Sequence, residues 1–585
     1  LGHRRLSIRD LSNNGSQPMH SSCGRYTIVY NGEIYDNVEI KKIVKKENIK
    51  LKSTTDTEIL LESISILGLN KTLENINGMF AFALYDKYLK KIYLVRDRLG
   101  IKPLFYYKNK NSIAFASEIK AIKKFFKFEK KINTSSLNSF LKYGFNKTST
   151  SIFENLEQVK PGEIVEIDHN LILNKKKYWN LLEFFKEEKN NNTLDENIGL
   201  LEKLINNAVK IRLESDVEVG SFLSGGIDST IISKTMSEVS KKKINTFSVG
   251  FLEKEFDESA DAKKIANHIG SNHHEIIFGK KELLNFFEEL PNIYDEPFAD
   301  SSQIPTSIIS QFAKKNQTGV ILSGDGGDEL FGGYNRYIEA NNAINQKINF
   351  KIFVKQLIGS TLINLNPKII SILENIFNQK NLQERSKKYL AFQLLNDKSY
   401  SNFLSQIFNT DHIISTNILN REILNNDFEF ISNSYEKFMA QDLNEYLPND
   451  ILTKVDRASM YSSLEVRVPL LDYRIVKFAI NLKIDHKINN SNQKILLGKL
   501  LEKKIPKYLI KKKKVGFGIP IDKWLNTFLR EKVNFLLSDE CLNKNPYLNK
   551  ETVKLIWSQH KNGMAPNGLK IWNIIVLQNW INSIE

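Results

Sequence analysis

The alternation of apolar and polar positions predicts a β-rich unit at the start of the chain. Strands are expected over residues 25–30, 79–85, 92–95, 104–107 and 113–116, where apolar residues alternate with polar ones or run together. Helical spacing marks residues 37–46 and 57–66, and Thr54-Thr55-Asp56 before the second segment is typical of a helix N-cap. We place this first domain at residues 1–185.

The pattern changes after a polar linker at residues 186–195. A helix follows with one apolar face, formed by Leu201, Leu204, Ile205, Ala208 and Val209. Strands and helices then alternate over residues 219–223, 230–239, 244–249, 260–269, 275–278, 283–290 and 320–322. This alternation predicts a doubly wound parallel sheet. Residues 349–437 and most of the remainder look helical, with a loop at residues 511–520. The second domain is expected at residues 196–585.

A glycine-rich loop joins the first strand of the second domain to its helix. It reads Ser224-Gly225-Gly226-Ile227-Asp228-Ser229. Glycines allow a tight bend close to a ligand, and a helix N-terminus offers N–H groups to an anion. The spacing differs from that of a β/γ-phosphate P-loop and is typical of a loop that holds the diphosphate released when ATP adenylates a substrate. The motif alone leaves an ordinary strand–helix turn open.

A second loop follows the apolar run at residues 320–322. It reads Ser323-Gly324-Asp325-Gly326-Gly327-Asp328-Glu329. These carboxylates would repel one another unless a cation lay between them, and a Mg²⁺ that bridges phosphate oxygens fits better than a solvated acidic loop. Both loops are expected at the carboxyl ends of parallel strands, where open α/β sheets bind ligands.

Composition narrows the function classes. A chain of 585 residues is too long for one core, so two or three domains are expected. The net charge of +16 suggests a nucleic-acid partner, but Lys and Arg are spread along the chain, with one cluster at residues 511–514. The two cysteines, Cys23 and Cys541, are too few for a disulfide framework or a thiolate zinc site and indicate a reducing cytosol. No apolar run approaches the length of a membrane span.

Many short motifs occur in the order of one family. They lie at residues 5–8, 15–19, 31–35, 56–58, 78–83, 96–104, in both loops above, and at residues 256–258, 295–300, 302, 454–457, 465–472 and 514–518. On these motifs the chain resembles glutamine-hydrolysing asparagine synthetases, which are class II amidotransferases. The resemblance implies an Ntn-type αββα glutaminase sandwich, here incomplete at its start. An ATP-pyrophosphatase domain with a doubly wound parallel sheet and a helical C-terminal part would follow.

The resemblance also implies a glutamine pocket in the first domain. Arg5 would pair with the α-carboxylate of glutamine and Asp56 with its α-ammonium group. Asn31 and Gly32 would donate to the oxyanion of the tetrahedral intermediate, and Glu33 would be a further contact. From the residues alone, Asp56 is equally a helix cap and Asn31-Gly32 a hairpin turn.

In the second domain the resemblance implies an ATP site and a metal site. The expected ATP contacts are Phe222, Ser224, Gly225, Gly226, Asp228, Ser229, Val249, Ser323 and Gly324. Mg²⁺ would bind Asp228 and Asp328. Without the resemblance, Phe222 and Val249 are ordinary core residues.

Catalytic roles are expected for Asp325, where the acyl-adenylate would form, and for Lys514, which would neutralise phosphate charge. The cluster at residues 511–514 is otherwise a solvated or RNA-contacting patch. Glu465 and Arg467 are expected to organise the pocket of the acceptor carboxylate, and the role of Lys454 is left open.

The implied reaction has two halves. The side-chain carboxylate of aspartate attacks the α-phosphorus of ATP to give β-aspartyl-AMP and diphosphate, and ammonia from glutamine then crosses the domain interface and displaces AMP. The expected cofactors are ATP and Mg²⁺, and the partners are small molecules, with no nucleic acid and no membrane. A cytoplasmic enzyme is expected, and a homodimer is left open.

Three alternatives remain. The same chemistry would serve an amidotransferase that acts on a sugar carboxylate in surface polysaccharide synthesis. A tRNA-modifying ATP pyrophosphatase shares the first loop but would lack the glutaminase motifs. A non-catalytic scaffold would not need Asp228, Asp325, Asp328 and Lys514.

The family's nucleophile is a cysteine at the mature N-terminus, and the chain as given starts with Leu1. Residues 1–8 match a family segment that lies further along, so we expect a truncated form of a longer protein. Cys23 has no free amine and is interpreted as incidental. The chain as written is therefore expected to make amide from ammonium salts but not from glutamine, and its first domain to be unstable alone.

Overall fold

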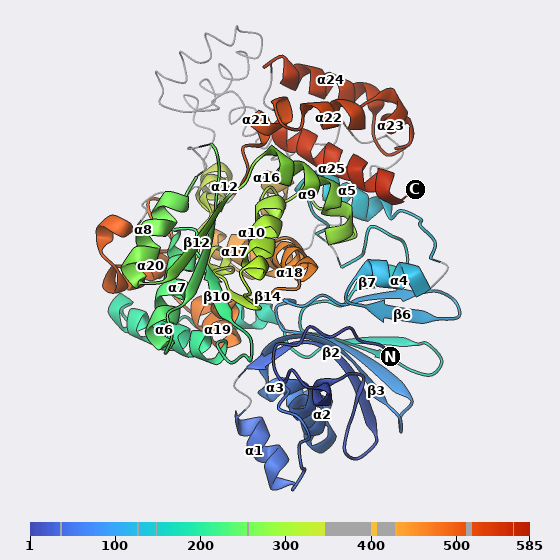
Figure 1. The fold of residues 1–585 in the computed structure, drawn as a ribbon, viewed down its shortest axis with the longest axis vertical. Helices are drawn as coiled ribbons and strands as arrows, with labels where there is room; N and C mark the ends of the chain where they lie inside the picture. The colour runs from blue at the N-terminus through green and yellow to red at the C-terminus, as the bar shows by residue number, and fades with distance from the viewer. Residues whose placement is uncertain are drawn as a thin grey trace.

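The structure, a computed structural model, describes most of the chain in two parts (Figure 1). The described residues are 1–35, 38–125, 128–147, 149–253, 257–345, 399–405, 413, 427–510, 518–564 and 567–584. Most of the segment for which the sequence predicts helices, 349–437, lies outside them.

The first domain contains two antiparallel sheets. The six-stranded sheet has the order β1-β2-β3-β4-β8-β9, with β1 at Met19–His20, β2 at Tyr26–Tyr35, β3 at Asn77–Asp86, β4 at Lys91–Arg96, β8 at Glu163–Ile167 and β9 at Leu173–Lys177. The three-stranded sheet has the order β6-β5-β7, with β5 at Phe105–Lys108, β6 at Ile113–Ala116 and β7 at Leu156–Gln158.

Side-chain alternation along the strands separates the layers of this domain. In β3, Phe80 and Phe82 face the helical side and pack with Ile59 and Ile64 of α2 (Asp56–Leu67). Between them, Ala81 points to the other face, where the two sheets meet. Small residues at that face allow the sheets to approach closely. Helices α1 (Val38–Lys46) and α3 (Leu69–Asn75) flank α2.

On its outer face, the three-stranded sheet packs against two helices. Phe105 and Tyr107 of β5 share a core with α4 (Ile119–Phe125) and α5 (Thr134–Tyr143). The layers therefore run helix, sheet, sheet, helix, and the expected αββα sandwich is confirmed.

The second domain is built on a parallel sheet of order β12-β11-β10-β13-β14. Its strands are β10 (Val219–Phe222), β11 (Asn245–Gly250), β12 (Asn272–Ile277), β13 (Val320–Leu322) and β14 (Glu465–Arg467). The chain starts at β10, moves outwards to β12 and returns to the other side of β10. The strand order therefore reverses between β10 and β13, which confirms the doubly wound sheet. Such a switch point opens a crevice at the carboxyl ends of the strands.

Helices connect and cover this sheet. Those that precede β13 are α6 (Leu194–Ile211), α7 (Ile227–Val239), α8 (Ser259–Ile269), α9 (Lys280–Tyr294) and α10 (Gln303–Lys315). Helix α6 starts with a capping box between Thr193 and Glu196 and buries Leu201, Ile205, Ala208 and Val209 on the expected face. Neither α10 nor β14 is predicted by the hydrophobic pattern. Strand β14 has only three residues, and α10 is buried on most of its surface, so it shows no apolar stripe.

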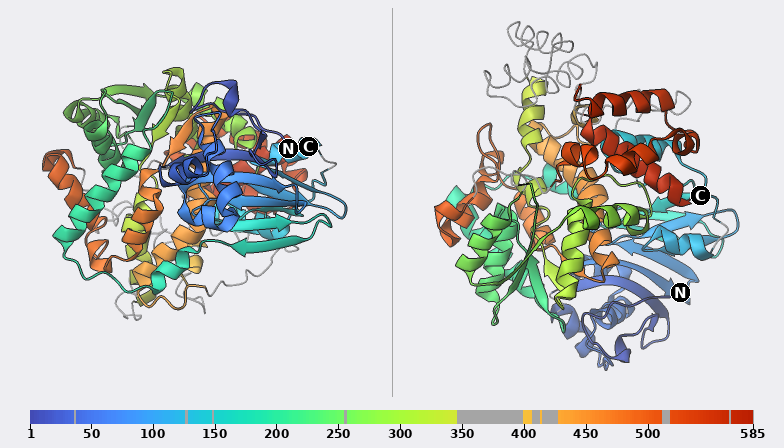
Figure 2. Two further views of the ribbon diagram at one scale, coloured as in Figure 1. Left: turned by 90° about the horizontal axis from the view of Figure 1, so that it is seen from below. Right: turned by 45° about the horizontal axis from the view of Figure 1, so that its top comes forward.

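The C-terminal part is helical, as expected, and joins the two domains. Helices α18 (Leu452–Tyr461) and α20 (Ile495–Lys504) contact α10 and α7, respectively. Helix α25 (Gly568–Ile584) packs against α9, and Asn573 donates to the carbonyl of Leu141 in the first domain. Figure 2 shows the first domain lying alongside both the parallel sheet and these helices. No helix among the described residues is long and apolar enough to cross a membrane.

Candidate active site

A cavity of about 720 Å³ lies at the switch point between β10 and β13. It is lined by most residues that the sequence assigns to ATP, to metal and to the adenylate: Phe222, Ser224, Gly226, Asp228, Ser229, Val249, Ser323, Gly324, Asp325 and Asp328. Gly225 is not part of the lining but belongs to the same loop. The structure thus brings both predicted loops to one place, although the role of each residue stays a prediction.

The loop after β10 is shaped to bind an anion. Gly225 has a φ of +80°, in the left-handed region that favours glycine, and Gly226 is the N-cap of α7. The Ser229 hydroxyl lies 3.2 Å from the Ser224 amide and 3.1 Å from the Ser224 hydroxyl, which closes the turn. The first turn of α7 therefore points its N–H groups towards the cavity, as a diphosphate would require.

The second loop touches the first directly. A Cβ atom on Gly324 would lie only 2.7 Å from the backbone nitrogen of Ser229, so only glycine allows this approach. The hydroxyl of Ser323 donates to Oδ2 of Asp325 at 2.7 Å, which orients that carboxylate in the lining of the cavity.

Asp228 and Asp328 converge on one cation, the ammonium group of Lys494. Its Nζ contacts Oδ2 of Asp228 and lies 2.7 Å from Oδ1 of Asp328. Burial alone would lower the pKa of Lys494, but the two carboxylates outweigh it and raise that pKa above its ordinary value. Lys494 is therefore charged and occupies the position between the carboxylates.

The two carboxylates would suit Mg²⁺ if the ammonium group of Lys494, which lies between them here, moved aside. Two carboxylate oxygens from separate loops are hard ligands, and Mg²⁺ commonly keeps one or two carboxylates and completes its shell with water and phosphate oxygens. Among the described residues, no group of three or more His, Cys, Asp or Glu side chains could enclose a metal. A two-carboxylate site that shares its metal with a nucleotide is thus the arrangement that these residues fit.

Sequence reasoning did not identify Lys494 as a site residue. It lies in the polar stretch Ser491-Asn492-Gln493-Lys494, which has no motif and resembles a surface loop. Only the folding of α20 against α7 places this lysine in the cavity.

Lys454 is a second buried cation in the cavity. Its Nζ lies 3.1 Å from Oδ2 of Asp300 and donates to the hydroxyl of Ser302 at 2.9 Å. Burial alone would lower the pKa of Lys454. The negative charges of Asp300, Asp450 and Asp325 outweigh burial and raise that pKa above its ordinary value, so the group is charged. A cation beside Asp325 suits an acceptor that carries a carboxylate.

Glu329 follows the predicted metal ligand Asp328 and is fully buried. Burial and the charge of Asp328 raise the pKa of Glu329 to about 7, although the Tyr334 hydroxyl donates to it at 2.5 Å. Its protonation state therefore changes near neutral pH.

Glu465 and Arg467 are expected to organise the pocket of the acceptor carboxylate, and this role stays a prediction. Neither lines the nucleotide cavity. Both are buried in β14, where Nε of Arg467 donates to Glu465 at 2.8 Å, and Arg467 faces the first domain. Lys514 and the rest of residues 511–517 lie outside the described residues.

The residues expected to bind glutamine lie around the end of β2. Asp56 accepts hydrogen bonds from the Tyr30 hydroxyl at 2.7 Å and the Ile34 amide at 2.8 Å, and burial raises its pKa. Thr55, rather than Asp56, caps α2. The guanidinium group of Arg5 donates to backbone carbonyls of residues 9, 10 and 12 in its own loop.

The alternative of a hairpin turn at Asn31-Gly32 is wrong. Strand β2 runs unbroken through both residues and pairs with β3 from Tyr26 to Tyr35. Gly32 has a φ of +153° and lies against the backbone of β3, so a side chain there would collide with Met79. Pairing with a long neighbouring strand overrides the local turn tendency.

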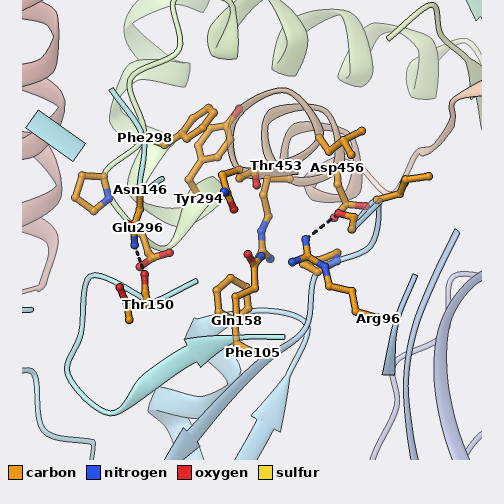
Figure 3. A pocket seen from close by; sticks show the side chains of 17 residues that line it. Arg96, Phe105, Asn146, Thr150, Gln158, Tyr294, Glu296, Phe298, Thr453 and Asp456 are labelled. Atoms are coloured by element: carbon orange, nitrogen blue, oxygen red, sulfur yellow. Dashed lines mark hydrogen bonds between the residues drawn. The ribbon is translucent and has the colours of Figure 1, made fainter. Parts of the chain in front are cut away.

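A small cavity of about 50 Å³ lies between the domains, as Figure 3 shows. Arg96, Phe105 and Gln158 of the first domain face Tyr294, Glu296, Phe298, Thr453 and Asp456 of the second. Beside it, Nζ of Lys102 lies 2.9 Å from Oδ1 of Asp456, and both side chains are buried. This volume can hold only one or two molecules of the size of water or ammonia.

Comparison with known proteins identifies both domains. The asparagine synthase family matches residues 200–582, and the glutamine amidotransferase domain family matches residues 1–179. The chain is 31% identical to asparagine synthetase [glutamine-hydrolyzing] 1 of Bacillus subtilis (strain 168), over 99% of this chain and 89% of that protein. It is 28% identical to asparagine synthetase [glutamine-hydrolyzing] 3 of the same organism, over 92% and 84%.

A relative with a different name matches part of the chain. Amidase chry2 of Gibberella zeae is 31% identical over 58% of this chain and 51% of that protein. Among solved structures, the glutamine phosphoribosylpyrophosphate amidotransferase of B. subtilis is 12% identical over 46% of this chain and 65% of that chain, with a TM-score of 0.22. From the family matches and the full-length relatives, the chain belongs to the asparagine synthase family and carries a glutamine amidotransferase domain ahead of its synthase domain.

Proposed function

We propose that this protein converts aspartate to asparagine through β-aspartyl-AMP, with ammonia supplied by glutamine hydrolysis. The observation that carries the proposal is the single cavity in which the diphosphate loop, Asp325 and two buried lysines meet. The family membership supports the same chemistry.

The adenylation step follows from the chain's own groups. The N-terminus of α7 and the loop before it hold the diphosphate part of ATP, and Lys494 supplies positive charge at the phosphates. Lys454 orients the acceptor carboxylate beside Asp325, so that an acceptor oxygen reaches the α-phosphorus. Mg²⁺ bound with ATP, by Asp228 and Asp328, would neutralise the charge that develops on the leaving diphosphate.

The amidation step needs ammonia inside the protein. Ammonia that reaches bulk water becomes ammonium, which has no lone pair for attack. The cavity beside Lys102 and Asp456 supports an interior route, because it is lined by side chains of both domains and matches the size of ammonia. Displacement of AMP by ammonia then gives the amide.

One assay tests the proposal. The purified chain is given ATP, Mg²⁺ and aspartate with either ammonium chloride or glutamine, and asparagine, AMP and diphosphate are quantified. Equal amounts of all three products with ammonium are expected. Release of ADP and phosphate, or AMP formation that does not depend on aspartate, would refute it.

A sugar carboxylate is the second candidate acceptor. A side cavity of about 200 Å³ shares Asp300, Ser301 and Tyr446 with the nucleotide cavity and is also lined by Tyr143, Tyr400 and Gln441. Aromatic faces beside amide and carboxylate groups would suit a larger, hydroxyl-rich acceptor. Faster amide formation from uronic-acid nucleotides than from aspartate would favour this candidate.

A further inference from the structure

Glu33, an expected contact of glutamine, is bound to a residue of the other domain. Its carboxylate lies 2.7 Å from Nη1 of Arg9 and 3.4 Å from Nη2 of Arg467. The Glu33 side chain is 4% exposed and that of Arg467 is 0% exposed, so solvent screens this contact very little. The glutamine pocket and β14 of the synthase domain therefore share one ion-pair cluster.

The other donors of Arg467 fix its guanidinium group to the synthase domain. Nε donates to Glu465 at 2.8 Å, and Nη1 donates to the carbonyls of Arg212 and Glu214, each at 2.8 Å. Only Nη2 points across the interface to Glu33. The guanidinium group of Arg467 is thus held in place by the synthase domain, with Nη2 directed at Glu33.

The backbone of Arg467 continues the connection to the adenylate site. Its carbonyl accepts a hydrogen bond from the Ser323 amide at 3.0 Å, and the Ser323 hydroxyl donates to Asp325 at 2.7 Å. Leu322 pairs directly with Arg467 in the sheet. The Glu33 carboxylate is therefore connected to the Asp325 carboxylate through two residues, Arg467 and Ser323, and the hydrogen bonds that each of them makes.

We propose that Arg467 is a positioning residue that couples occupation of the glutamine pocket to nucleotide binding, with Glu33 as the group through which it acts. Glu33 has two sets of partners. It pairs with Arg9 and Arg467 as seen here, or it turns to bound glutamine and leaves Arg467 to Glu465. The second arrangement changes the charge balance on β14 and hence the position of the Ser323 loop.

The inference rests on the proposed function, because it takes Glu33 as part of a glutamine pocket. Coupling between two sites is reciprocal, so ATP must change the affinity for glutamine by the same factor as glutamine changes the affinity for ATP. The equality holds for any coupling, so the size of the factor and its loss in the variants are what test Arg467: a purely structural role would leave the factor unchanged in variants that fold.

The experiment is isothermal titration of L-glutamine into the full chain, with and without ATP and Mg²⁺, and the reverse titration. No acceptor is added, and glutamate is assayed so that only runs without hydrolysis are fitted. We expect the two ratios of dissociation constants to agree at about fivefold or more in the wild type. In Glu33→Gln and in Arg467→Lys both ratios should fall to within about twofold of one.

Asn77→Ser is the matched control. Asn77 also crosses the interface, donating to Asp472 at 2.8 Å, but is not bonded to β14, so the wild-type ratio should persist. Ratios of one in the wild type, or wild-type ratios retained in Glu33→Gln, would overturn the coupling while leaving the proposed function intact. Failure of glutamine to bind the wild type would instead remove the glutamine pocket and the inference with it. If Arg467→Lys does not fold, Glu33→Gln decides.

Discussion

Replacing Lys494 with methionine should expose the repulsion between the two carboxylates that it joins. Both carboxylate oxygens contact one nitrogen, so they are no more than about 5–6 Å apart. At an effective dielectric constant of about 20, two unit charges at ~5 Å repel by about 3 kcal/mol. Methionine keeps the length and apolar stem of lysine, so packing is largely preserved. We therefore expect Lys494→Met to lose about 3 kcal/mol of unfolding free energy.

The assay is thermal and urea unfolding near neutral pH, first with a chelator and then with added Mg²⁺. The loss corresponds to a drop in Tm of roughly 4 °C for a domain as large as the second one. Mg²⁺ should restore more stability to Lys494→Met than to the wild type, because the variant offers two carboxylates that no ammonium group occupies. Lys499→Met, which removes a half-exposed lysine from the same helix α20, is the control and should change stability by less than about 0.5 kcal/mol.

Two results would refute the reasoning. If Lys494→Met matches the control, the carboxylates do not form a shared cation site. If the variant is destabilised but gains no more from Mg²⁺ than the wild type, the site is structural and the assignment of Asp228 and Asp328 to the metal fails.

Four further predictions follow from the site. Asp328→Ala should abolish aspartate-dependent diphosphate release in a folded protein, and wild-type exchange between ATP and diphosphate in this variant would exclude the metal role. Asp325→Ala should reduce that exchange far more than ATP binding, whereas an equal loss of both would make it a simple binding contact. Native Glu329 keeps its proton up to about pH 7, but an ordinary glutamate loses it near 4.5, so the stability from this group is lost as pH rises between those values. The unfolding free energy of wild type relative to Glu329→Gln should fall from about pH 5 to pH 8, and a flat difference would contradict the shifted pKa. Lys102→Met should cost about 3–5 kcal/mol because it leaves Asp456 buried without its partner, and a second change, Asp456→Leu, should recover most of this loss in urea unfolding.

Local rules were enough to predict a β-rich first domain, the parallel sheet of the second domain and the diphosphate loop. The strand 219–223 is mostly apolar, and the glycines that follow it can take conformations that other residues cannot, so both features are visible in the chain itself. The same holds for α6, whose cap and apolar face are set by neighbouring residues. The alternation of large and small residues in β3 also determines which face meets the second sheet.

Tertiary structure decided which charges meet. Lys494 and Asp228 are 266 positions apart, and Arg467 and Glu33 are 434 apart, so no local pattern links them. Asn31-Gly32 has the composition of a turn, but pairing with β3 makes both residues part of strand β2. A residue's neighbours in sequence fix its backbone preference, but the field at a buried charge depends on groups that only folding brings within a few ångströms.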